Sequence, residues 1–126
     1  MDIKSHKDLR VYQVAIDSAM RIHALTRSWP DEERYSMTSQ ILRSSRSICA
    51  NIGEAWIRRP YPRHFSSKLR DAGGEAAETI VWLELASLHG YIGTDDLSRL
   101  MEAYQFVHGG LIKMSNQPKK WCFPPP

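Results

Sequence analysis

Residues 43–56, RSSRSICANIGEAW, gather several side-chain types from which catalytic and binding sites are made. Its three serines and Cys49 could act as nucleophiles, but a nucleophile needs a neighbouring base, and this stretch lacks the Gly-x-Ser-x-Gly turn of many serine hydrolases. Ser45, Ile48, Cys49 and Ile52 instead recur at the spacing of one helix face. The pattern predicts a packed helix with a buried, reduced thiol, and we expect no enzyme activity.

Metal and cofactor motifs are missing from the sequence. Helical bundles that hold paired metals carry Glu-x-x-His on facing helices, and this chain contains no such motif. The five histidines are scattered, and Cys49 and Cys122 fit no metal spacing. There is no Gly-x-x-x-x-Gly-Lys loop, and Gly73-Gly74 lies inside a helical pattern, where it favours a tight crossing or a bend. We therefore expect no cofactor, no metal and no small-molecule substrate.

Arginines are the remaining candidates for binding. Five of them lie within 21 positions, close to Tyr61, and we expect them to contact the phosphates of RNA or DNA: Arg43, Arg46, Arg58, Arg59 and Arg63. A second interpretation is that they meet acidic side chains of a neighbouring subunit in a head-to-tail contact. The residues alone leave both interpretations open.

Charge is segmented along the chain although the net charge is only +3. Residues 43–70 carry seven basic side chains and one acid, whereas residues 71–106 carry seven acids and one arginine. Residues 1–42 are balanced, with six of each sign. This segmentation argues against inferring nucleic-acid binding from the overall isoelectric point.

Four long segments with helical periodicity must position these side chains. We expect helices from the Ser5–Asp8 capping box to about residue 27, from 36 or 37 to about 57, from about 63 to 89, and from about 94 to 115. Pro30, Pro60, Pro62, Gly90 and Gly93 separate them. No convincing period-two run is present, so the sequence predicts an all-α, antiparallel up-down-up-down four-helix bundle over residues 1–116. An irregular, proline-rich tail is expected over 117–126.

Surplus apolar residues predict self-association. In the first segment, Leu9, Tyr12, Ile16, Ala19, Met20 and His23 share one face, while Val11, Val14, Ile22 and Leu25 form a second stripe. The later half of the third segment is apolar nearly all round, and we expect Val81, Trp82 and Leu85 at a subunit interface. We also expect a cytoplasmic protein without a membrane segment, because the N-terminus lacks a signal-peptide apolar run and no window reaches the roughly 20 apolar residues of a span.

The sequence resembles the small helical proteins of intervening sequences in bacterial 23S rRNA genes, the so-called S23 ribosomal protein family. The family pattern FxDLxVWQxA…LTxQLRRAxxSIxANIAEG is similar to HKDLRVYQVAIDSA at 6–19 and to YSMTSQILRSSRSICANIGEAW at 35–56. The similarity continues through FSSKLRDAGGEAAETIVWLELASLHGYI at 65–92 and covers about residues 6–112.

This resemblance implies a left-handed four-helix bundle that assembles as a homopentameric ring. A related branch, the accessory variability determinant of diversity-generating retroelements, is a positively charged pentamer that binds reverse transcriptase and nucleic acid. Arg43, Ser47, Asn51 and Glu54 match the characteristic positions of the family, and we expect Asn51 and Glu54 to order a helix–helix or subunit contact. Ser44 and Ala55 depart from the usual second arginine and glycine, and with the acidic 71–106 segment they argue against a strongly basic ring.

Together these observations predict a non-enzymatic, homo-oligomeric binding or scaffold protein. Its expected partners are further copies of itself, RNA or DNA, or a nucleic-acid enzyme such as a reverse transcriptase. The alternative is a purely structural oligomer whose basic and acidic segments pair at subunit interfaces.

Overall fold

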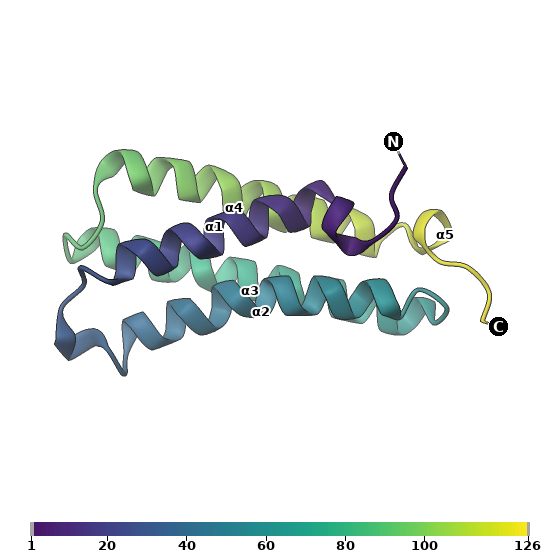
Figure 1. The fold of residues 1–126 in the computed structure, drawn as a ribbon, viewed down its shortest axis with the longest axis horizontal. Helices are drawn as coiled ribbons and strands as arrows, with labels where there is room; N and C mark the ends of the chain where they lie inside the picture. Colours follow the sequence, from purple (N-terminus) through teal and green to yellow (C-terminus); the bar gives the residue numbers. More distant parts are fainter. Residues whose placement is uncertain (1, 126) are drawn as a thin grey trace.

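The computed structural model describes residues 2–125, and within them it contains helices but no strands. Its four long helices are α1 (Arg10–Thr26), α2 (Met37–Ile57), α3 (Pro62–Leu88) and α4 (Thr94–Ser115). Three shorter elements are the 3-10 turns η1 (His6–Asp8) and η2 (Asp31–Glu33) and the one-turn helix α5 (Pro118–Trp121). The long helices run alternately up and down along one axis (Figure 1).

Local chemistry accounts for where the helices begin and end. The Ser5–Asp8 capping box forms, but it caps η1, and α1 begins only after Leu9, which has extended backbone angles. Pro62 occupies the first turn of α3, where its missing N–H costs nothing. Gly90 follows α3 with a positive φ of 76°, a conformation that favours glycine.

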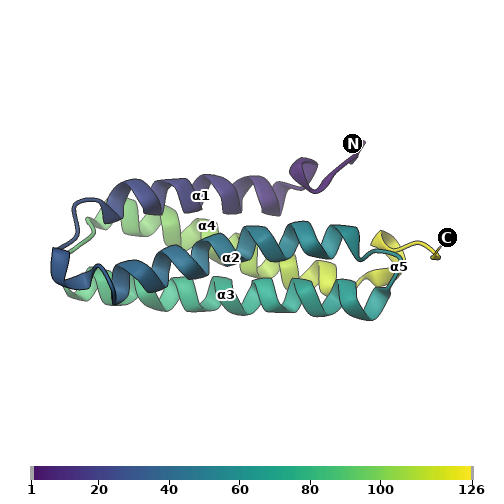
Figure 2. The same cartoon turned by 60° about the horizontal axis from the view of Figure 1, so that its bottom comes forward.

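The antiparallel arrangement gives the bundle two ends, which lie on opposite sides of the view in Figure 2. We call one the terminal end; it comprises the N-terminal segment, the α2–α3 connection, the last turn of α4 and α5, which are residues 2–10, 54–71 and 113–125. The other, the distal end, comprises the α1–α2 and α3–α4 connections with their flanking turns, residues 27–39 and 83–100. None of the helices in residues 2–125 is both long and apolar enough to cross a bilayer.

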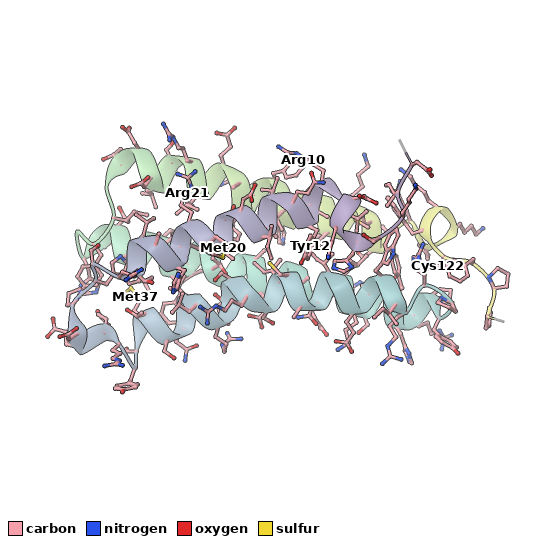
Figure 3. All side chains as sticks on the ribbon, viewed as in Figure 1. Arg10, Tyr12, Met20, Arg21, Met37 and Cys122 are labelled. Carbon is pink, nitrogen blue, oxygen red and sulfur yellow. The ribbon has the colours of Figure 1, made fainter. Side chains whose placement is uncertain are left out.

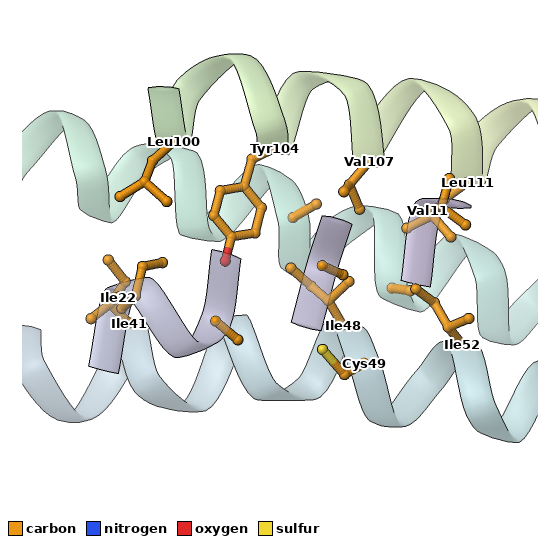
Figure 4. Packing of buried hydrophobic residues seen from close by; sticks show 14 of the residues in the cluster. Val11, Ile22, Ile41, Ile48, Cys49, Ile52, Leu100, Tyr104, Val107 and Leu111 are labelled. Carbon is orange, nitrogen blue, oxygen red and sulfur yellow. The ribbon is translucent and has the colours of Figure 1, made fainter. Parts of the chain in front are cut away.

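The core is a continuous apolar layer contributed by all four long helices. Tyr104, Val107 and Leu111 project from α4 towards Ile48 and Ile52 of α2 (Figure 4). Each of these five side chains is at most 1% exposed. Removing such side chains from water is the main stabilising contribution to a bundle of this size.

The inward face of α1 combines residues of both expected stripes. Val11, Ala15 and Ile22 are buried, whereas Met20 is 64% exposed and lies on the outside (Figure 3). Leu9 and Ala19 of the first stripe are buried as well, so each stripe contributes two buried residues. Part of the apolar surplus from which we inferred self-association is thus used inside the chain.

Two glycines allow neighbouring helices to approach closely. A Cβ atom on Gly110 of α4 would lie 2.5 Å from Val11 Cγ1 of α1, so the two helices cross at a point that admits no larger side chain. A Cβ atom on Gly73 of α3 would lie 3.3 Å from Ile112 Cδ1 of α4. Gly74, in contrast, has no such neighbour within 4 Å, so only Gly73 of this pair serves a crossing.

The tail is more ordered than its four prolines suggested. Pro118 opens α5, and the ring of Trp121 packs at 63° to the ring of Trp56 with centroids 6.2 Å apart. The helix ends at Trp121, and the backbone of Cys122 is extended (Figure 3). An aromatic contact thus fastens the start of the tail to the end of α2.

Candidate nucleic-acid interface

The α2–α3 connection places three of the expected arginines at the terminal end. Helix α2 ends at Ile57, and Arg58 is its C-cap residue. The backbone N–H of Tyr61 donates to the Arg58 carbonyl at 2.8 Å, which closes the turn before Pro62 starts α3. Arg58, Arg59 and Arg63 therefore surround one tight turn, while Arg43 and Arg46 lie further back along α2.

Arg59 is held by aromatic rings. Its guanidinium carbon lies 3.6 Å from the ring centroid of Trp56 and 5.0 Å from that of Phe123. Its Nε donates to the Trp56 carbonyl at 2.9 Å, and burial lowers the pKa of the guanidinium. Arg59 thus fixes the tail to α2 through cation–π contacts and is a poor candidate for direct phosphate contact.

Arg58 and Arg63 are more available. The Arg58 guanidinium lies 3.9 Å from the Glu54 carboxylate, which is a long distance for an ion pair. Lys68 shares this carboxylate, and its Nζ is closer, at 3.4 Å. Both arginines are exposed, and within residues 2–125 Arg63 has no carboxylate within 4.0 Å. Two guanidinium groups at this turn can therefore reach an external phosphate.

Arg43 is already paired inside the chain. It donates to Glu75 at 3.0 Å and also to Glu78, both on α3, and the hydrogen bond that Glu78 accepts raises the pKa of the guanidinium. Trp82 Nε1 donates to the same Glu78 carboxylate at 3.0 Å. Arg46, one turn further along α2, is exposed and has no carboxylate within 4.0 Å among the described residues. The two mid-helix arginines therefore differ, and only Arg46 keeps an uncompensated charge.

Further cations lie at the terminal end that the sequence analysis did not single out. The terminal end carries eleven basic and four acidic side chains in total. Besides the arginines already named, the basic set comprises Lys4, Lys7, Arg10, Lys68, Arg70, Lys113, Lys119 and Lys120. The distal end carries six acids and three arginines. The predicted topology could have revealed this basic cluster. An up-down-up-down bundle brings the start of the first helix, the second connection and the end of the fourth helix together.

The residues expected at helix–helix or subunit contacts differ in their exposure and in the partners they bind. Asn51 Nδ2 donates to the carbonyl and the hydroxyl of Ser47, at 3.0 and 3.1 Å, so its hydrogen bonds stay within α2 rather than reaching a neighbouring helix. Glu54 does connect two helices, through Lys68 on α3. On α3, Val81 is 51% exposed, while Trp82 and Leu85 are half-buried.

The serines and the α2 cysteine serve packing. Ser44 Oγ and Thr79 Oγ1 are 2.7 Å apart between α2 and α3, and both residues are fully buried. Burial raises the pKa of the Cys49 thiol to about 11, so the thiol stays protonated at neutral pH and is a weak nucleophile. Among residues 2–125, no three His, Cys, Asp or Glu side chains come together as metal ligands would.

A protein family and a solved structure are similar to this chain. A family model described as 23S rRNA-intervening sequence protein matches residues 7–113. A crystal structure of a protein with unknown function from the S23 ribosomal protein family of Bacteroides thetaiotaomicron VPI-5482 aligns at 33% identity and a TM-score of 0.75. That alignment covers 84% of this chain and 95% of the other. No curated protein matches the chain.

Proposed function

We propose that this chain, which belongs to the 23S rRNA-intervening sequence protein family, is a non-enzymatic, oligomeric binding protein that holds RNA or DNA at its terminal end. The observation that carries this proposal is the segregation of charge along the bundle axis. The terminal end carries eleven basic and four acidic side chains, whereas acidic side chains outnumber basic ones two to one at the distal end. A long bundle with one basic end attracts a polyanion to that end first.

Phosphate contacts follow from the side chains that remain unpaired. Arg63 and Lys119 are exposed and have no carboxylate partner in the described chain, and Arg58 has only the distant Glu54. Guanidinium and ammonium groups bind phosphate by charge-assisted hydrogen bonds. Tyr61 and Phe123 are 49% and 47% exposed beside them, which favours a single strand whose bases can stack on aromatic rings.

The alternative interpretation assigns the same cations to acids of a neighbouring subunit. Arg43 does not fit this interpretation, because its partners Glu75 and Glu78 belong to the same chain. The acids of the distal end remain available for such pairing. A solution measurement therefore has to separate phosphate binding from subunit pairing.

Salt titration makes that separation. Fluorescence anisotropy of a labelled single-stranded RNA of about 20 nucleotides should report binding at about 50 mM salt, with log K falling linearly with log salt at about 0.7 per phosphate contact. Subunit pairing without a ligand would give no anisotropy change at any salt concentration. That result would remove nucleic acid from the proposal.

We also propose self-association, with a pentamer as the expected state. Val81 and Leu88, 51% and 83% exposed, lie seven residues apart on the outward side of α3, with half-buried Leu85 between them. An apolar strip of this kind is covered in most soluble proteins. Light scattering should give a mass of five times 14.5 kDa. Val81→Glu with Leu88→Glu should lower this mass, and Met20→Glu, on α1, should not; a 14.5 kDa wild-type particle would contradict the proposal.

A further inference from the structure

A half-open pocket lies at the terminal end, where α1 and α4 separate from their crossing. The N-terminal segment, the first turn of α1, the last turns of α4 and helix α5 together enclose about 360 Å³. Sites for small molecules in proteins typically measure about 300–1,000 Å³. The pocket is therefore large enough for a compact ligand, and segments from both ends of the chain are needed to build it.

The uncharged lining of this pocket is mainly apolar, with Gln13 and Gln117 as its polar members. Leu9, Val11 and Met114 form buried parts of the lining, each at most 8% exposed. Ile3 and Trp121 add half-buried sides from the N-terminal segment and α5. Val11 and Gly110, at the close approach of α1 and α4, both line the pocket. Such a lining favours the hydrocarbon part of a ligand.

Cations surround the opening. Arg10, Lys113 and Lys120 line the pocket, all three are exposed, and none has a carboxylate within 4.0 Å in the described chain. The single acid of the lining is Asp8, whose Oδ2 accepts from the backbone N–H groups of Lys4 and Ser5 at 2.8 and 3.1 Å. These hydrogen bonds lower the pKa of Asp8, and they already occupy its carboxylate.

We propose that this pocket binds an amphiphilic anion, in which a carboxylate or similar anionic head is joined to an aliphatic or ring-shaped body. The body lies on the floor of Leu9, Val11 and Met114, and the head meets Lys113 and Lys120 at the rim. A neutral amphiphile loses the attraction of three cations, and a cationic one is repelled by them. A nucleic-acid strand fits less well, because most of the uncharged lining is apolar and only Gln13 and Gln117 offer amide groups to base edges. This assignment is independent of the proposed nucleic-acid function.

Calorimetric titration with decanoate, below its micellar concentration, tests the proposal. Decanoate should bind once per chain, at least tenfold more tightly than decanol, and decyltrimethylammonium should bind more weakly than either. Lys120→Gln should weaken decanoate binding about fivefold, the effect of one partly exposed charge pair. Lys119→Gln is the matched control, because Lys119 is the exposed neighbour with the same charge and does not line the pocket.

Three outcomes would overturn the proposal. Equal affinity for decanoate and decanol would mean that no anion is recognised. Equal weakening by Lys119→Gln and Lys120→Gln would mean that the basic end attracts anions without a site. The absence of saturable decanoate binding by the folded wild-type chain would remove the ligand altogether. Both lysines are exposed, so both variants should fold, and a thermal melt followed by circular dichroism checks this.

Discussion

Replacing Gly110 with alanine places a methyl group at the crossing of α1 and α4. The new Cβ atom would lie 2.5 Å from Val11 Cγ1, well inside the contact distance of about 3.5–4.0 Å between carbon atoms. Val11 is β-branched and lies in α1, where one χ1 rotamer dominates, so its side chain cannot rotate out of the way. The helices themselves must shift apart.

The neighbouring glycine supplies the reference for the magnitude. Gly109 is exposed, and a Cβ atom there would meet nothing within 4 Å. Gly109→Ala should therefore raise the free energy of unfolding by about 1 kcal/mol, the helix-propensity difference between the two residues. Gly110→Ala gains the same helix propensity, but the overpacked crossing lowers the free energy of unfolding by about 1–3 kcal/mol. We expect it to be less stable than Gly109→Ala by about 1–3 kcal/mol.

Urea unfolding followed by circular dichroism measures this difference, with all variants at one protein concentration because self-association affects apparent stability. Adding Val11→Ala to Gly110→Ala should recover part of the loss, since the clashing methyl group is then absent. If Gly110→Ala is as stable as Gly109→Ala to within about 0.5 kcal/mol, the helices do not cross as closely as described, and the reasoning fails.

Four other predictions concern the core and the site. Tyr104 is fully buried and its hydroxyl has no hydrogen-bond partner among the described residues, so Tyr104→Phe should raise the free energy of unfolding by about 1 kcal/mol or more; a decrease would show that the hydroxyl is bonded. Only Cys122 should react quickly with a disulfide reagent at pH 8 in the native state, and both thiols should react in urea; two fast native thiols would contradict the burial of Cys49. Because the Cys49 pKa rises from 9.0 to about 11 on folding, the unfolded thiol loses its proton first, and stability should fall as pH rises from 9 to 11, less so in Cys49→Ala. Arg43→Gln should change RNA affinity less than twofold, because Glu75 and Glu78 already compensate this charge, whereas a tenfold loss would place Arg43 at the phosphate.

The helices of this bundle could be predicted closely from local sequence signals. Residues 37–57 and 94–115 are helical as expected, because proline and glycine interrupt an apolar pattern of helical period on both sides of each segment. These signals act within a few residues, so they are visible without knowledge of the tertiary structure. The Ser5–Asp8 box also forms, although it caps a separate turn ahead of α1.

Contacts between distant segments could not be predicted in the same way. Helix α1 has two apolar stripes of similar strength, and the choice between Val11 and Met20 as the inward residue depends on where α2 and α4 lie. The stacking of Arg59 between Trp56 and Phe123 joins residues more than sixty positions apart and makes an expected phosphate ligand structural. The helical periodicity and the family resemblance both indicated the bundle, but neither gave information on such individual pairings.

A comparison of two triple variants tests whether the terminal end is the nucleic-acid face. One variant carries Arg58→Gln, Arg63→Gln and Lys119→Gln. The matched control replaces three exposed arginines outside the terminal end, Arg21, Arg27 and Arg99, by glutamine and so has the same net charge.

At about 0.1 M salt, where charges act over about 10 Å, the terminal-end variant should bind single-stranded RNA at least tenfold more weakly than the wild type. The slope of log K against log salt concentration should be smaller in magnitude by about 2, as expected for three lost phosphate contacts. The control variant should bind RNA within twofold of the wild type. Equal weakening of both variants would contradict the claim, because attraction would then depend on net charge and not on the basic end.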